Sequence, residues 1–365
     1  MADEAVKTAE KEKPAEPAVK YIVSPAPHVF APESVPAIMW TVVATLLPAG
    51  AAGVYFFGLP ALGVILATIA GAVMAELLGE RFLLGKKRIT IGDGSAVLTG
   101  LLLAYCLPPG IEPWKAWVGG ALSIFVAKTV FGGLGQNVFN PALIGRAILL
   151  AAWPAAMTAW ALPKNGLRVP QALFGVDAVS GATPLAAVKA AAASAARDGL
   201  PLPLDKMAGS WTDLQALFLG NVGGCIGETC ALALLIGGAW LLWRGLISWH
   251  IPAVYIATVF VLAIAFSAPA AISAGASPEM LVRTGLFHIL GGGLFLGAFF
   301  MATDMVTSPL TRNGQMLFAF GAGVLVVMIR RFGGYPEGVC YSILIMNMIV
   351  PLIDRYTMPR KFGKK

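Results

Sequence analysis

Charged residues are scarce in this sequence of 365 residues. Asp, Glu, Lys and Arg make up 12% of it and hydrophobic residues 58%, and the mean hydropathy is +0.77. These values exclude an ordinary soluble globular domain. Histidine occurs only at His28, His250 and His288, and the last two fall at the ends of expected helices, where an isolated histidine is usually structural. We therefore predict no catalytic residue and no metal ligand within the chain.

Nucleotide-binding loops are also missing. The sequence has no phosphate-binding P-loop and no GxGxxG pattern between a strand and a helix, the glycine-rich patterns that hold nucleotide phosphates. Chemistry on NADH would therefore belong to a partner protein.

Cysteine is rare and shows no CxxC pair. The four cysteines are Cys106, Cys225, Cys230 and Cys340, and the spacing of five between Cys225 and Cys230 is poor for two ligands on one helix face. Packing as small apolar side chains is the simpler interpretation. Ligation of an iron–sulfur cluster shared with a neighbouring subunit is the alternative.

Long apolar runs dominate what remains. A membrane-spanning helix needs about 20 apolar residues, and about ten such runs occur. They lie near 36–57, 59–78, 93–107, 114–131, 137–153, 215–243, 249–267, 285–303, 315–329 and 337–353. The sequence therefore predicts an all-α polytopic membrane protein with about ten transmembrane helices. We also expect it to contact membrane lipid.

The two halves of the chain repeat each other. A shift of 201 residues places Pro108 on Pro309 and Phe131-Gly132-Gly133 on Phe332-Gly333-Gly334. Each half, 35–153 and 215–354, holds about five expected helices, and an odd number reverses the orientation of the second copy. This predicts two inverted five-helix repeats, with an extramembrane segment at 154–214 between them.

The distribution of positive charge predicts the orientation. Residues 1–34 lack the apolar core and cleavage site of a signal peptide and are predicted to form a largely disordered tail. Lys and Arg gather at 81–88 and in the basic tail 355–365. Because such residues accumulate on the cytoplasmic side, we expect both termini in the cytoplasm and 154–214 outside, although Arg330 and Arg331 fall near the opposite face. The basic residues do not follow one surface, so no nucleic-acid partner is predicted.

The extramembrane segment contains the most informative short motif. Asp177-Ala178-Val179-Ser180-Gly181-Ala182-Thr183 precedes Pro184 and an Ala-rich stretch. Thr followed by Pro is typical of a helix start, with Thr as N-cap and Pro at the first helical position, and that explanation needs no further function. The same helix start is also an anion site, where a phosphate ester on Thr183 would meet free N–H groups.

This motif resembles the flavinylation signature of the D subunit of the bacterial Rnf ion-translocating electron-transport complex, related to the B subunit of the sodium-translocating NADH:quinone reductase. Three further segments share the resemblance, which covers the chain from about residue 20 to its C-terminus. They are FGGLGQNVFNP at 131–141, GGCIGET at 223–229 and FGGYPEG at 332–338. One departure is Met305, where the family usually has proline.

The resemblance implies a membrane subunit that couples electron transfer between ferredoxin and NAD to sodium or proton translocation. FMN would be joined to Thr183 as a phosphoester, with Asp177, Ser180, Gly181 and Ala182 forming the attachment site. The implied partners are iron–sulfur and flavin subunits of the complex and a periplasmic flavin transferase. Residue 183 would face the periplasm of a bacterial inner membrane, and the sequence leaves open a second, noncovalent flavin. A small-solute channel or transporter without redox function, or a passive scaffold, would suit the inverted repeat equally well.

Ionisable residues within apolar runs are costly and therefore functional candidates. Four are candidates for an ion path or for structural pairing: Arg146, Glu228, Asp304 and Glu337. Four others are interpreted as anchors at the membrane interface: Glu76, Arg81, Arg330 and Asp354.

Overall fold

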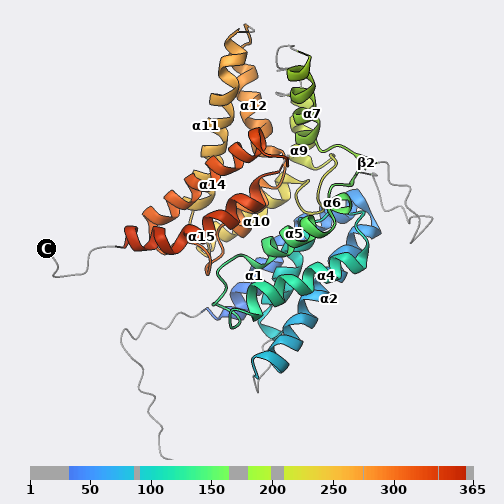
Figure 1. Ribbon diagram of the computed structural model, residues 1–365, viewed down its shortest axis with the longest axis vertical. Helices are drawn as coiled ribbons and strands as arrows, with labels where there is room; N and C mark the ends of the chain where they lie inside the picture. Colours follow the sequence, from blue (N-terminus) through green and yellow to red (C-terminus); the bar gives the residue numbers. More distant parts are fainter. Residues whose placement is uncertain are drawn as a thin grey trace, which may run out of the picture. The chain divides into compact units, whose positions relative to one another are not determined.

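A computed structural model describes residues 33–85, 91–163, 180–198, 209–273, 275–335 and 337–358. Residues from Val35 onward form one compact unit. It is almost entirely helical (Figure 1). Most of the predicted tail 1–34, the middle of the predicted segment 154–214 and residues 359–365 of the basic tail lie outside the described residues.

Among the described residues, the first half contains five helices, π-helical extensions of two of them and one 3-10 turn. α2 continues into the π-helical turn η1, and α4 continues into the π-helical turn η3. The elements are α1 (Val35–Phe57), α2 (Leu59–Leu78), η1 (Gly79–Leu83), the 3-10 turn η2 (Ile91–Asp93), α3 (Ser95–Tyr105), α4 (Pro113–Ile124), η3 (Phe125–Thr129) and α5 (Pro141–Ala152). α2 packs against both α3 and α4, and α4 against α5.

In the second half, the residues that the structure describes form seven helices and a π-helical turn. The elements are α9 (Trp211–Leu219), α10 (Ala231–Trp243), α11 (His250–Ser273), α12 (Pro278–Leu290), α13 (Leu294–Leu296), η4 (Gly297–Met301), α14 (Arg312–Phe332) and α15 (Val339–Thr357). α11 packs against α14, and α14 against α15.

Packing in the two halves follows the 201-residue repeat. The shift places α2 largely on α11, α4 within α14 and α5 within α15. The pair α2–α4 therefore corresponds to α11–α14, and α4–α5 corresponds to α14–α15. Glycines permit the close crossings, because a Cβ on Gly71 would collide with the backbone of Trp117 and one on Gly323 with Thr258. Small residues at such crossings are typical of membrane helices.

Continuous membrane-length helices are fewer than predicted. Among the described residues five helices are long and apolar enough to cross a membrane, or six if one bent pair is a single span. The five are Val35–Phe57, Leu59–Leu83, His250–Ser273, Arg312–Phe332 and Val339–Thr357. A multi-pass helical membrane protein is thus confirmed, whereas the ten-helix arrangement is not.

Two predicted spans are broken, and others are short. The run 215–243 divides into α9 and α10, with non-helical backbone at 220–230, and α12 bends by 62° into α13 and η4. α3, α5 and α10 have only 11, 12 and 13 residues. The breaks coincide with the glycines of 223–224 and 291–293, and irregular backbone at membrane depth is tolerated where it is buried in protein.

The segment between the halves has its own small structure. α6 (Pro154–Met157) is followed by strand β1 (Trp160–Ala161), which pairs antiparallel with β2 (Ser180–Gly181). This two-residue ladder was not predicted. The Ala-rich helix was, and it is α7 (Pro184–Arg197). α7 is anchored on the second half by a small core: Leu185, Leu214, Leu217 and Phe287.

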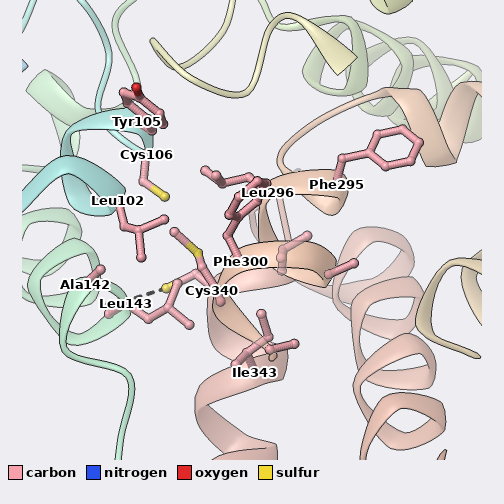
Figure 2. Close-up of a cluster of buried hydrophobic side chains, with 14 of the residues drawn as sticks. Leu102, Tyr105, Cys106, Ala142, Leu143, Phe295, Leu296, Phe300, Cys340 and Ile343 are labelled. Atoms are coloured by element: carbon pink, nitrogen blue, oxygen red, sulfur yellow. Dashed lines mark hydrogen bonds between the residues drawn. The ribbon is translucent and has the colours of Figure 1, made fainter. Parts of the chain in front are cut away.

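The main hydrophobic core joins the two halves. Figure 2 shows Leu102 and Cys106 from the end of α3 and Leu143 from α5 facing Leu296 and Cys340 of the second half. Tyr105, only 1% exposed, donates a hydrogen bond of 2.8 Å from its hydroxyl to the carbonyl of Leu46 in α1. These contacts fix α5 relative to α15, which positions the charged residues described next.

Candidate functional site

Thr183 is the N-cap of α7, as the sequence predicts. Its backbone is extended, and its hydroxyl accepts a hydrogen bond of 3.1 Å from the N–H of Ala186. Pro184 occupies the first helical position, where no N–H is needed. The Thr183 side chain is only 5% exposed, so it faces the protein interior, whereas Ala182 is exposed.

The rest of the motif is described only in part. β2 carries Ser180 and Gly181 and is held against Trp160 and Ala161, which sets the path of the chain into Thr183. Asp177 lies outside the described residues, and the side chain of Ser180 is likewise not described.

A small cavity lies beside Thr183. Its volume is about 20 Å³, room for about one water. The lining comes from α7, α9, the glycine-rich break at 222–229, the bend after α12 and the segment before α15. The residues are Thr183, Pro184, Leu185, Leu217, Val222, Gly223, Gly224, Cys225, Glu228, Thr229, Leu290, Gly292 and Glu337. Thr183 and the two carboxylates, treated as separate sites in the sequence, therefore line one cavity.

Three of the four ion-path candidates form one buried cluster. Arg146 of α5 donates a hydrogen bond of 2.9 Å to Glu228 and pairs through its other terminal nitrogen with Glu337. Arg146 also lies 3.9 Å from the sulfur of Cys225. Arg146 and Glu228 are 7% and 9% exposed. One guanidinium thus serves two carboxylates, and it comes from the opposite half of the chain.

The segments that carry the family resemblance meet at this cluster. Asn140, in 131–141, caps α5 by accepting a hydrogen bond of 3.0 Å from Ala142 and donates one to the carbonyl of Met301. The segment 223–229 supplies Glu228, and 332–338 supplies Glu337. The first segment therefore positions the helix of Arg146, and the other two supply its partners.

Asp304 lies in a different setting. Its carboxylate accepts hydrogen bonds from the N–H of Val306 at 3.3 Å and the hydroxyl of Thr307 at 3.1 Å. These bonds close the turn between η4 and α14. No ion pair of Asp304 occurs among the described residues.

All four cysteines are buried and free. Cys225 donates a hydrogen bond to the carbonyl of Cys106, and Cys340 donates to that of Leu143 (Figure 2). Their burial supports core packing. Cys225, Glu228 and Glu337 place possible ligand atoms within 4.8 Å of one another, but Arg146 already pairs with both carboxylates.

Two residues interpreted as interface anchors are instead internal. Glu76 is 2% exposed and pairs with Lys128 of η3, which also donates to Ser95 at 2.6 Å. Arg330 is 7% exposed and donates to the carbonyls of His288 and Gly291. Arg330 is turned inward because α12 ends inside the protein, and the free carbonyls at that helix end need a donor. The sequence contained no signal for either pairing, since the partners are 39 to 52 residues apart.

A larger groove adjoins the small cavity. It has a volume of about 680 Å³ between α7, α9 and α12, and it shares Pro184, Leu217 and Val222 with the cavity. Arg283 and Asp213 also line it. Hydrogen bonds from the backbone N–H and the hydroxyl of Ser210 hold the pKa of Asp213 below its ordinary value, which keeps its carboxylate charged.

Comparison with known proteins decides the family. The model of the NQR2, RnfD, RnfE family matches residues 22–363. The chain belongs to this family. It is 47% identical over 345 residues to the D subunit of a proton-translocating ferredoxin:NAD(+) oxidoreductase complex of Clostridium ljungdahlii, covering 94% of this chain and 97% of the relative.

Two other relatives show a similar match. The chain is 43% identical to the D subunit of a Na(+)-translocating ferredoxin:NAD(+) oxidoreductase complex of Acetobacterium woodii, over 93% of this chain and 95% of the relative. It is 42% identical to the D subunit of an ion-translocating oxidoreductase complex of Stutzerimonas stutzeri, over 91% of this chain and 93% of the relative. The resemblance inferred from the motifs is thereby confirmed, and the relatives are subunits of ion-translocating oxidoreductases.

Proposed function

We propose that this chain is the membrane subunit of an Rnf-type complex and carries electrons through FMN esterified to Thr183. The complex couples electron transfer between ferredoxin and NAD to translocation of sodium or protons. The observation that supports the flavin is the position of the Thr183 hydroxyl, at the start of a 14-residue helix and beside a small cavity that adjoins a larger groove. The names of the relatives support the reaction.

The residues present fit a covalent FMN in two respects. Phosphate oxygens on Thr183 would take over the hydrogen bond from Ala186 that the hydroxyl accepts now, at the end of the helix that favours negative charge. The small cavity holds only about one water, so the ring system belongs in the adjoining groove. At about 680 Å³, that groove is of the size that holds organic ligands. Arg283 and Asp213 offer it polar contacts.

Bound flavin would supply the electron-carrying chemistry, and the chain would hold and tune it. Because Thr183 is nearly buried, the flavin transferase must act before α7 settles on its small core, or on a state in which it has moved. A second, noncovalent flavin is compatible with this proposal but has no assigned residues.

Arg330 does not count against the orientation proposed from the sequence. Both termini lie in the cytoplasm of a bacterium with an inner membrane, 154–214 lies in the periplasm, and the two halves form inverted repeats. In the sequence, Arg330 argued against this orientation, because it was expected near the external face, where few cations occur. Its guanidinium is instead buried and bonded to carbonyls at the end of α12, so it does not act as a topology signal.

The ion path is proposed to include Glu228, Glu337 and Arg146, with Asp304 as a separate candidate. Two carboxylates share one guanidinium beside the cavity of Thr183. Added electrons on a nearby flavin would favour uptake of a compensating cation there, since charges interact strongly at low dielectric. This gives electron transfer and ion movement a common location.

One experiment separates this proposal from a channel without redox function. The purified protein is denatured, separated by gel electrophoresis and examined under ultraviolet light. A fluorescent band at the mass of the chain is expected for covalent flavin. A dark band from cells that also express a functional flavin transferase contradicts the proposal.

A further inference from the structure

A second cavity, of about 80 Å³, lies between α7, α11, α12 and α14. Three of its lining residues carry positive charge: Lys189, Arg330 and Arg331. No carboxylate is among the described residues that line it. The remaining wall is mostly apolar, with Phe266, Val327 and Leu185 as its largest members.

The positive charge in this cavity is not neutralised by its hydrogen-bond partners. Arg330 donates to the carbonyls of His288 at 2.5 Å and Gly291 at 3.1 Å, and Lys189 donates to the carbonyls of Gly333 and Tyr335. Carbonyls satisfy the donors, but they do not cancel the charge that burial makes costly. Burial accordingly lowers the pKa of the Lys189 amine.

One side-chain donor of Arg330 also lacks a partner. The Nε of Arg330 is buried and has no hydrogen-bond partner among the described residues, and the residue as a whole is only 7% exposed. Buried donors of native proteins are nearly always satisfied. The Nε itself is not exposed to the cavity, but an anion that enters the cavity would balance the charge of the Arg330 guanidinium.

The cavity borders the lipid-facing surface. Phe266 of α11 and Phe332 at the end of α14 are 40% and 70% exposed and contact each other edge to face at 6.4 Å. Both helices are candidate membrane spans. The end of α14 therefore marks a membrane interface, where the exposed rings of Phe266 and Phe332 lie near the cations of the cavity.

We propose that this cavity binds the phosphate of an anionic phospholipid headgroup, with the acyl chains lying along Phe266 and Phe332. The charge of Lys189, Arg330 and Arg331 matches a headgroup phosphate, and the neighbouring rings match acyl chains. A bound phosphate would also explain the position of Arg331 on the external side of the membrane, which usually carries few Lys and Arg residues. The proposal does not depend on the flavin.

The test uses the purified complex in neutral detergent and counts bound lipid by native mass spectrometry. Dioleoylphosphatidylglycerol, dioleoylphosphatidylcholine and inorganic phosphate are titrated separately. The test variant is Lys189→Gln/Arg331→Gln, which leaves Arg330 to stabilise the end of α12. The matched control, Arg312→Gln/Arg355→Gln, removes the same charge from positions that do not line the cavity.

The wild type and the control are expected to bind phosphatidylglycerol in preference to phosphatidylcholine. Each interfacial cation contributes roughly a fivefold gain in affinity for an anionic lipid, so the double variant should bind about 25-fold more weakly. Equal binding of phosphatidylcholine, or unchanged binding in the double variant, overturns the proposal. Displacement of the lipid by millimolar inorganic phosphate, or loss of a neighbouring subunit from the double variant without loss of lipid, also overturns it.

A flavin control separates this proposal from the preceding one. Fluorescence on a denaturing gel should be unchanged in Lys189→Gln/Arg331→Gln, and the flavin-free Thr183→Ala variant should still bind phosphatidylglycerol. If phosphatidylglycerol binds only to Thr183→Ala, the cavity belongs to the flavin and the lipid assignment is wrong.

Discussion

Arg146 of α5 donates a hydrogen bond of 2.9 Å to Glu228, which lies 82 residues later in the chain. The two residues belong to opposite halves of the repeat, and both are almost fully buried. Their contact, together with that to Glu337, ties the halves together at the cavity of Thr183. Substitutions at and beside this cavity can therefore test flavin attachment, structural stability and ion movement one at a time.

Replacement of Thr183 by Ala should abolish covalent flavin while leaving the protein in the membrane. The hydroxyl is the bond-forming group, and its loss as N-cap should cost only about 1 kcal/mol. Fluorescence on a denaturing gel, at matched amounts of protein, is the measurement. Thr158→Ala, which removes another hydroxyl of the same segment, should keep full fluorescence. Thr183→Ser is a weaker test, because serine also offers a hydroxyl to the flavin transferase. A fluorescent Thr183→Ala band would refute the attachment site.

Cysteine labelling should place α7 on the periplasmic side of the membrane. The native cysteines are all buried, so background labelling by an impermeant maleimide should be low. Within α7, Ala195 is buried, whereas Ala193 is exposed and is therefore the test position. Ala193→Cys should react in intact cells, and Arg355→Cys only after the inner membrane is opened. The reverse pattern would mean that the topology is inverted and that flavin is attached in the cytoplasm.

Loss of Arg146 should destabilise the protein far more than loss of a surface charge. Arg146→Met leaves two buried carboxylates without their counter-ion, and breaking such a pair typically costs about 3–5 kcal/mol. The triple variant Arg146→Met/Glu228→Gln/Glu337→Gln should recover much of this, because no uncompensated charge remains. Thermal unfolding in detergent measures both, with Arg355→Met as a control at an exposed residue expected to change stability by about 0.5 kcal/mol or less. A triple variant as unstable as Arg146→Met would contradict the explanation by charge.

Neutralising Glu228 should affect both ion uptake and the flavin. Glu228→Gln removes negative charge from the cavity beside Thr183, which should raise the reduction potential of an attached flavin and lower ion uptake several-fold. Asp304→Asn, whose hydrogen bonds lie in another turn, should leave the potential unchanged. Uptake is measured in vesicles that contain the whole complex, and the potential by redox titration of the same sample. Normal uptake in both variants would assign these carboxylates to structure alone.

Local signals were enough to predict much of this protein. Apolar runs of about 20 residues predicted the helices, because a buried backbone must form its hydrogen bonds within the segment. Thr183-Pro184 predicted the start of α7, because an N-cap and the residue after it are adjacent in the chain. The motifs at 131–141, 177–183, 223–229 and 332–338 were enough to indicate the family.

Contacts between distant residues could not be predicted in the same way. Hydropathy does not distinguish a lipid-facing helix from one buried in protein, so it missed the breaks of α9–α10 and α12–α13 and the shortness of α5. Arg146 could be identified as needing a carboxylate, but its partners Glu228 and Glu337 depend on how the two halves pack. The same packing turned Glu76 and Arg330 inward, since each has a partner only where two helices from different parts of the chain meet.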